Sequence, residues 1–224
     1  MLQGGRPHAA PGHPSRRRRV AQHEGQPVKR VVLVDAGGTN IGSVRYALQR
    51  LGTDAELTSD AARIRAASHV ILPGVGAAAP GMRRLHDAGL VEVLRGLTQP
   101  VLGVCLGMQL LCERSEESDT ECLGLVPSTV RRFVDRPGLR VPHMGWNRLH
   151  RDVDHPLTNG LDDADTAYFV HSYAVPAGDY TLASSEHGER FSAVIAAGNF
   201  MGMQFHPERS AGVGARLLRN FLSL

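Results

Sequence analysis

Cysteine is scarce in this 224-residue chain, which has three: Cys105, Cys112 and Cys122. An odd number without a CxxC pair speaks against both a disulfide framework and a structural zinc site. Each cysteine is therefore treated as a free thiol, and Cys112 and Cys122 are interpreted as small buried hydrophobic residues. No metal site is expected.

Long apolar runs are also missing. No stretch reaches the length of about 18 apolar residues that marks a membrane span, and the N-terminus does not have the pattern of a secretory signal. We therefore expect a cytoplasmic location and no membrane partner. Aromatic residues make up only 5% of the chain, but hydrophobic residues make up 42%, which is enough for the core of one domain.

Positive charge is concentrated at the start of the chain: residues 1–29 carry a net +5, whereas the rest carries −2. This segment is rich in Gly, Pro, His and Arg and has almost no apolar periodicity, which predicts a disordered basic extension before a domain at 30–224. Arg16–Arg19 could form a nucleic-acid or targeting element. We favour a solvated tail or a wrongly assigned start codon, and expect no nucleic-acid partner.

Three apolar runs, in residues 30–35, 69–76 and 100–105, each precede a glycine turn and a helix pattern. They predict a parallel sheet with crossover helices at 41–51, 82–95 and 106–113, and an active site at the carboxyl ends of the strands. After about residue 122 the segments become shorter and alternate, as antiparallel or mixed strands do. These strands are expected at 128–134, 166–175, 180–185, 190–198 and 199–205, with a closing helix at 211–222.

The stretch PVLGVCLGMQLL, from Pro100 to Leu111, places a rare cysteine in a glycine turn. Gly103 and Gly107 would allow Cys105 to stand in a tight strand-to-helix turn similar to a nucleophile elbow. The helix dipole and free N–H groups at this point favour a thiolate. A purely structural turn would explain the same pattern.

A nucleophilic thiol needs a base, and the base needs an orienting group. GMQFHPERS supplies His206 as a base and Glu208 as a carboxylate, with the rigid Pro207 between them. Alone, His-Pro-Glu would be read as a surface turn. Together with the cysteine turn it predicts a catalytic set.

GVCLGMQLL followed by QFHPE resembles the class I glutamine amidotransferases. Further stretches, PGVG, SEE, HMGWN and YFVHSY, resemble the glutaminase subunit of imidazole glycerol phosphate synthase, an enzyme of histidine biosynthesis. The likeness covers residues 30–224. It implies a three-layer α/β fold with a central mixed, mostly parallel sheet and flanking helices.

The resemblance implies that Cys105, His206 and Glu208 form a triad that hydrolyses glutamine to glutamate and ammonia through a glutamyl thioester, without a cofactor. It implies an oxyanion hole from the N–H of Leu106 and the loop at Val75 and Gly76. PGVG could equally be a plain loop. Residues that match substrate-binding positions are Gly74, Gln109, Glu117, Ser172 and Tyr173. Glu116 is the alternative to Glu117, and the acidic residues of this segment could instead be ordinary surface charge.

The partner implied by the resemblance is a (βα)8-barrel cyclase, in a heterodimer, which uses the ammonia to make imidazole glycerol phosphate and the aminoimidazole carboxamide ribonucleotide. The positions that match its interface are Asn40, Trp146, Tyr168, His171 and Arg209. Trp146 could instead be a core residue, and Tyr168 and His171 could simply be half-buried on a strand. The stretch DAGGTN departs from the family pattern, with Ala36 in place of an aromatic residue and Thr39 in place of a glycine. These two differences affect the expected shape of the loop before Asn40, and therefore how Asn40 contacts the partner.

The same sequence features are compatible with two other functions. The chain could be the glutaminase of another class I system, such as pyridoxal phosphate, guanylate or anthranilate synthesis, although SEE and HMGWN favour the histidine pathway. It could also be an inert interaction module of the same fold, against which the intact set of Cys105, His206 and Glu208 speaks.

Overall fold

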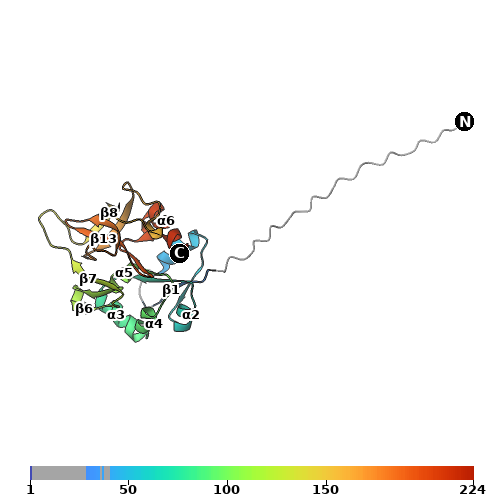
Figure 1. Ribbon diagram of the computed structural model, residues 1–224, viewed down its shortest axis with the longest axis horizontal. Coiled ribbons are helices and arrows are strands. Elements are labelled where there is room, and N and C mark those ends of the chain that lie inside the picture. Colours follow the sequence, from blue (N-terminus) through green and yellow to red (C-terminus); the bar gives the residue numbers. More distant parts are fainter. Residues whose placement is uncertain (2–28, 36, 38–40) are drawn as a thin grey trace.

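The centre of the molecule is an eight-stranded mixed sheet in the order β2-β1-β3-β4-β14-β13-β12-β9 (Figure 1). The computed structural model describes residue 1, residues 29–35, residue 37 and residues 41–224. β2, β1, β3, β4 and β14 run parallel, and the remaining pairs are antiparallel. In sheet order the strands are Ala55–Thr58, Val31–Val34, His69–Gly74, Val101–Cys105, Phe200–Met203, Arg190–Ala197, Thr181–Glu186 and His150–Arg151. The expected mixed, mostly parallel sheet is confirmed.

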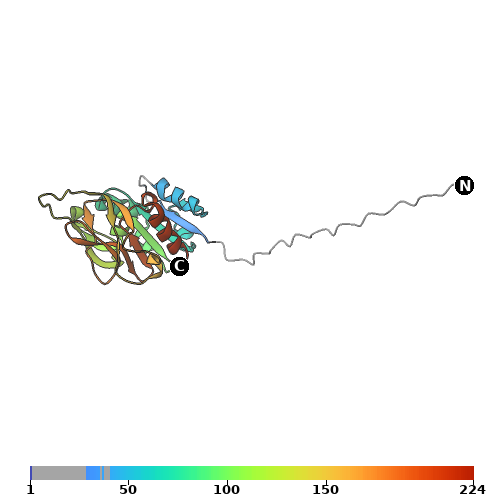
Figure 2. The ribbon, with the colours of Figure 1, turned by 90° about the horizontal axis from the view of Figure 1, so that it is seen from above.

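Helices cover both faces of this sheet, because the parallel strands bury side chains on both sides. Val31 and Leu33 belong to one core cluster with α1 (Ile41–Arg50) and α6 (Ala211–Leu222), which lie side by side in Figure 2. Val32 and Val34 belong to the second cluster. Its helices are α2 (Ala61–Arg65), α3 (Ala78–Asp87), α4 (Val91–Arg95) and α5 (Leu106–Leu110). The three-layer fold is thus confirmed.

Two expected helices were wrong in extent. The helix expected at 82–95 is divided into α3 and α4 near Gly89, whose φ of +65° is a left-handed conformation suited to glycine. The helix expected at 106–113 ends at Leu110, and Cys112–Ser115 forms β5. The helices expected at 41–51 and 211–222 are confirmed as α1 and α6.

Two smaller sheets stand beside the central one. β10 (Thr166–His171) pairs with β8 (His143–Arg148), and a second sheet has the order β11-β7-β5-β6. The additional strands are β6 (Thr120–Glu121), β7 (Val126–Arg132) and β11 (Tyr173–Ala174), and the short 3₁₀ helices are η1 (Glu117–Asp119), η2 (Pro156–Thr158) and η3 (Pro207–Arg209). The single strand expected at 166–175 is therefore two, separated at Ser172.

None of the helices within the described residues has the length and apolarity needed to cross a membrane. The expectation of disorder for 1–29 falls almost entirely on residues 2–28, which lie outside the described residues.

Candidate active site

Cys105 ends β4 in a strained conformation and is followed directly by α5. Its φ of +54° and ψ of −113° are unusual for a residue with a side chain. A Cβ on Gly103 would lie 2.6 Å from the Gly107 oxygen, and one on Gly107 would lie 1.8 Å from the Leu72 oxygen. Both glycines are needed because strand, turn and helix approach one another so closely. The strand–cysteine–helix turn expected from the sequence is confirmed.

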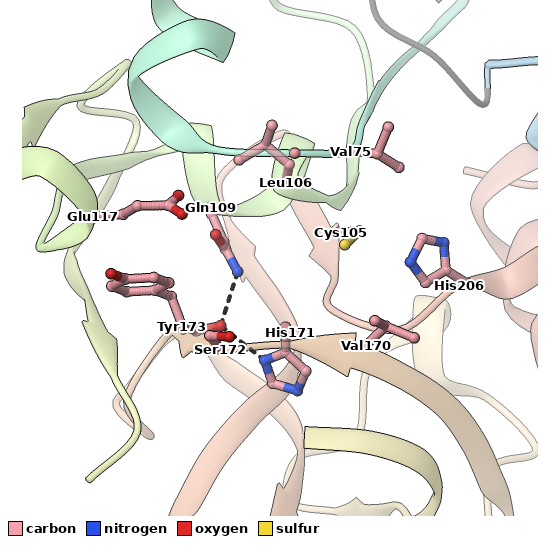
Figure 3. Close-up of a pocket in the computed structure, with 11 residues that line it drawn as sticks. Val75, Cys105, Leu106, Gln109, Glu117, Val170, His171, Ser172, Tyr173 and His206 are labelled. Carbon is pink, nitrogen blue, oxygen red and sulfur yellow. Dashed lines mark hydrogen bonds between the residues drawn. The ribbon is translucent and has the colours of Figure 1, made fainter. Parts of the chain in front are cut away.

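His206 lies at the carboxyl end of the neighbouring strand β14, just before η3. Its Nδ1 is 3.1 Å from Oε1 of Glu208, and both side chains are nearly buried. A carboxylate only accepts hydrogen bonds, so Nδ1 carries the proton that it donates to Glu208. In Figure 3 the imidazole ring faces the sulfur of Cys105. The structure therefore brings together all three residues expected to form the triad.

The electrostatic surroundings favour a proton on His206. Burial by itself lowers its pKa, but the hydrogen bonds and charges of Cys105 and Glu208 outweigh burial and raise the pKa to about 10. The imidazole can therefore hold a proton at neutral pH, as a group that later protonates a leaving nitrogen must.

Backbone contacts fix the turn that carries His206. The His206 N–H donates to the carbonyl oxygen of Tyr168 at 3.1 Å. The hydroxyl of Ser210, which is fully buried, donates to the His206 carbonyl at 2.7 Å and accepts from the Tyr168 N–H at 3.0 Å. The turn is thus attached to β10, a strand of a different sheet.

A pocket of about 260 Å³ opens between the cysteine turn and the segment around Ser172 (Figure 3). A cavity needs only about 10–15 Å³ of such volume to hold one water molecule, so this pocket has room for a ligand of the size of an amino acid. Its lining residues are Val75, Gly76, Cys105, Leu106, Gln109, Glu117, Val170, His171, Ser172, Tyr173 and His206.

The far end of the pocket carries acceptor groups. Gln109 on α5 donates through Nε2 to the Tyr173 carbonyl oxygen at 2.9 Å, while Glu117 accepts at Oε2 from the Ala78 N–H at 2.7 Å. The Glu117 carboxylate thus lies at the N-terminus of α3, where the helix dipole favours negative charge. Glu116 instead accepts from the Arg132 N–H at 2.9 Å and is not among the lining residues.

The loop after β3 forms the other wall. Val75 and Gly76 line the pocket beside Leu106, and the φ of +99° at Gly76 requires a glycine. Gly74 pairs with Cys105, and a Cβ on it would lie 2.9 Å from the Gly107 nitrogen. Close packing therefore accounts for Gly74, which is not one of the lining residues.

A separate aromatic group lies on the outer face of β8 and β10. Trp146, which is 55% exposed, makes an edge-to-face contact with Tyr168, and the Arg209 guanidinium lies 4.1 Å above the Tyr168 ring. Trp146 is thus not a core residue. His171 is buried and lines the pocket, so it is not part of this exposed group. Asn40 and the departures at Ala36 and Thr39 lie outside the described residues.

Two residues of the site were not predicted from the sequence: Val170, which lines the pocket, and Gln204, which is fully buried and does not line it. Gln204 directly follows β14, two residues before His206, and a polar side chain within this otherwise apolar stretch could have indicated it. Where side chains are described, no cluster of three or more His, Cys, Asp or Glu residues is arranged to hold a metal.

Comparison with known proteins gives one consistent family. Residues 32–224 match the model of glutamine amidotransferase class I. The imidazole glycerol phosphate synthase subunit HisH of Xanthomonas axonopodis pv. citri is 57% identical over 194 residues, which are 87% of this chain and 97% of the relative. The subunit HisH of Xylella fastidiosa is 55% identical over 194 residues, with the same coverage of each chain.

The fold has solved counterparts as well. The crystal structure of a glutamine amidotransferase superposes with a TM-score of 0.67 at 22% identity, over 86% of this chain and 97% of the other. Because the family model spans nearly all of residues 30–224 and the relatives are more than half identical, the chain belongs to the class I glutamine amidotransferases, within the family of HisH subunits of imidazole glycerol phosphate synthase.

Proposed function

We propose that this chain hydrolyses glutamine to glutamate and ammonia with Cys105 as nucleophile, His206 as acid and base, and Glu208 as the orienting carboxylate. The observation that carries the proposal is the strained turn that presents Cys105 to an imidazole already bonded to a buried carboxylate. The strained turn and the hydrogen bond between His206 and Glu208 could each be explained by a structural role alone. Their convergence at one pocket is what a nucleophilic site requires.

In the proposed reaction the Cys105 thiolate attacks the side-chain amide carbon of glutamine. His206 gives its proton to the departing nitrogen, and ammonia leaves behind a glutamyl thioester. A water molecule then gives a proton to His206 and attacks the thioester, which releases glutamate and restores the thiolate. The sum is glutamine plus water to glutamate plus ammonia, and no cofactor takes part.

The negative oxygen of the tetrahedral intermediate needs donors. We assign this role to the N–H of Leu106 and to the loop at Val75 and Gly76, both of which line the pocket. Losing one such donor typically reduces kcat by about 100- to 1,000-fold. The glycines beside Val75 make a change of its peptide orientation sterically easy.

The amino-acid end of glutamine is proposed to lie against the acceptors at the far end of the pocket. The Glu117 carboxylate and the Gln109 amide oxygen would bind the α-ammonium group, with the backbone at Ser172 and Tyr173 completing the contact. Gly74 contributes by allowing the loop to pack closely.

The ammonia is proposed to pass to a (βα)8-barrel cyclase in a heterodimer that makes imidazole glycerol phosphate and the aminoimidazole carboxamide ribonucleotide. The relatives are named as subunits of imidazole glycerol phosphate synthase, which supports a partner subunit. Direct transfer would shield ammonia from protonation to ammonium, which is not nucleophilic. We assign the interface to Trp146, Tyr168 and Arg209. The cytoplasmic location remains a prediction.

The substitution Cys105→Ala tests the proposal. It should abolish glutamine-dependent synthesis by the chain with its cyclase, whereas free ammonium salts should still support synthesis, because the cyclase is untouched. Product formation is measured with each nitrogen source. Glutamine-dependent synthesis by Cys105→Ala would show that Cys105 is not the nucleophile, and Cys122→Ala, at a buried thiol in the second core cluster, is the matched control.

A further inference from the structure

The fully buried side-chain amide of Gln204 contacts residues at both ends of the pocket, Cys105 and Gln109. The side chain of Gln204 has 0% exposure. Its Oε1 accepts from Nε2 of Gln109 at 2.9 Å, and its Nε2 donates toward Sγ of Cys105 at 3.9 Å. Gln204 therefore contacts both the nucleophile and a side chain that faces the amino-acid end of the substrate, without lining the pocket itself.

The direction of this chain of amides is set by a backbone group. The Tyr173 carbonyl only accepts, so the Gln109 atom that lies 2.9 Å from it must be Nε2. The second N–H of this nitrogen points to Gln204, which must therefore present its oxygen. The remaining end of Gln204, its NH₂ group, faces the sulfur of Cys105. A flip of either amide would oppose like groups.

One consequence concerns the substrate end of the pocket. With both N–H groups of Gln109 directed to Tyr173 and Gln204, its oxygen lies on the side of Glu117 (Figure 3). Two acceptor groups then face the place of a positively charged α-ammonium. The reversed amide would place N–H groups there and repel it.

The other consequence concerns the sulfur. An N–H donor interacts more strongly with a thiolate than with a neutral thiol, because hydrogen bonds to charged acceptors are stronger. The contact of Gln204 with Cys105 is long, as expected for sulfur, so its effect is modest. It acts from the buried side, opposite to the pocket.

We infer that Gln204 is a positioning residue for glutamine hydrolysis, which orients the Gln109 amide for the substrate's α-ammonium group and stabilises the Cys105 thiolate. This inference rests on the proposed glutaminase function. It assigns to one residue two separable effects, one on substrate binding and one on the state of the sulfur.

The effect through Gln109 is tested by a double-mutant cycle in the full chain with its cyclase and the cyclase's nucleotide substrate. Gln204→Met keeps the length of the side chain but removes both hydrogen-bonding groups. It should raise KM for glutamine about fivefold, as the loss of one hydrogen bond implies. In a Gln109→Met background, which raises KM by itself, it should cause no further rise. An equal rise in both backgrounds would overturn the role through Gln109.

The effect on the sulfur is measured without substrate, by iodoacetamide alkylation of the full chain. Gln204→Met should lower the rate at pH 7 about threefold, with or without Gln109→Met, and leave the rate at pH 10 unaltered, since access is unchanged. Burial raises the pKa of Cys112 well above its usual value and that of Cys122 to about 11, so both thiols react slowly, and Cys105→Ala gives the background rate. An unaltered rate at pH 7 would overturn this role.

Gln204→Glu is the matched variant, because it keeps the shape and an acceptor oxygen for Gln109, and full burial favours the protonated carboxyl. Urea unfolding of both variants separates a folding defect from an effect on KM. Its KM should stay within about twofold of the wild type, and a fivefold rise would contradict the inference. Absence of glutamine hydrolysis by the wild-type chain with its cyclase would instead overturn the proposed function and the substrate role of Gln204. The alkylation rates would still decide whether Gln204 acts on Cys105.

Discussion

At the scale of single residues, His143 and His171 show how the surroundings select a protonation state. Nδ1 of His171 is 2.8 Å from the Tyr173 carbonyl oxygen, so it is the donor, and Nε2 of His171 accepts from Nδ1 of His143 at 3.0 Å. Burial is the main cause that lowers the pKa of His143 to about 4 and that of His171 to about 3. Both rings are therefore neutral near pH 7, in contrast to His206.

This difference predicts a loss of stability in acid. Below pH 6.5 the unfolded chain binds protons that the folded chain does not bind until about pH 4 or 3. The free energy of unfolding should therefore fall as the pH drops from about 6.5 toward 4, by up to about 1.4 kcal/mol per pH unit for each buried histidine. Urea unfolding at a series of pH values measures this slope.

His143→Phe should make the slope smaller, since one such group is removed, whatever it does to the absolute stability. His86→Gln, at an exposed position on α3, is the matched control and should leave the slope unchanged. Equal slopes in the wild type and His143→Phe would show that His143 is not held neutral.

At the scale of elements, the packing of α6 against η3 positions the triad. A Cβ on Gly214 would lie 2.0 Å from the carbonyl oxygen of Pro207, whereas a Cβ on Gly212 would meet nothing within 4 Å. Both glycines belong to α6, but only Gly214 lies against the turn that carries Glu208. The helix and the turn can approach this closely only because Gly214 lacks a side chain.

Gly214→Ala should therefore push η3 away from α6, lower kcat through the displaced Glu208 and destabilise the fold by about 1–3 kcal/mol. Gly212→Ala should keep kcat and be neutral or stabilise by up to about 1 kcal/mol, because alanine favours helices. Glutaminase assays and urea unfolding of both variants make the comparison. A Gly214→Ala variant with the activity and stability of the wild type would contradict this account.

At the scale of the whole molecule, the pocket and the exposed aromatic group meet at β10. Tyr168 lies in the outer group beside Trp146, while Val170 and His171, two and three residues further along the same strand, line the pocket. The Tyr168 backbone also holds the turn of His206. A partner bound over Tyr168 would therefore contact the strand that shapes the site, which gives a physical route for activation.

Two effects should follow for the assembly. Binding of the liganded cyclase should speed glutamine hydrolysis, and Trp146→Ala should weaken cyclase binding at least tenfold, as loss of a central aromatic anchor does. Hydrolysis by the isolated chain should not change in this variant. Leu57→Ala, at an exposed apolar residue on the edge strand β2, should leave binding unchanged. Calorimetric titration measures the binding of the cyclase, and the rate of glutamine hydrolysis with the cyclase present measures the stimulation. Unaltered binding of the cyclase by Trp146→Ala would show that Trp146 does not belong to the interface.

Features that are encoded locally could be predicted from the sequence. The apolar run before Cys105 and its flanking glycines predict a strand that turns sharply into a helix, and the structure has that turn. The spacing of His206 and Glu208 places the two side chains within reach of each other across one proline. Such features depend on residues a few positions apart, so their patterns are visible in the chain.

Contacts between groups that are distant in sequence could be known only from the folded chain. The amides of Gln109 and Gln204 are 95 residues apart in sequence but share a hydrogen bond, because α5 follows β4 and Gln204 follows β14, its parallel neighbour. The helix begun at Leu106 ends at Leu110 since the next residues pair with β7. His171 is buried in the wall of the pocket for the same reason: contacts between separate strands, and not local pattern, fix burial and hydrogen bonding.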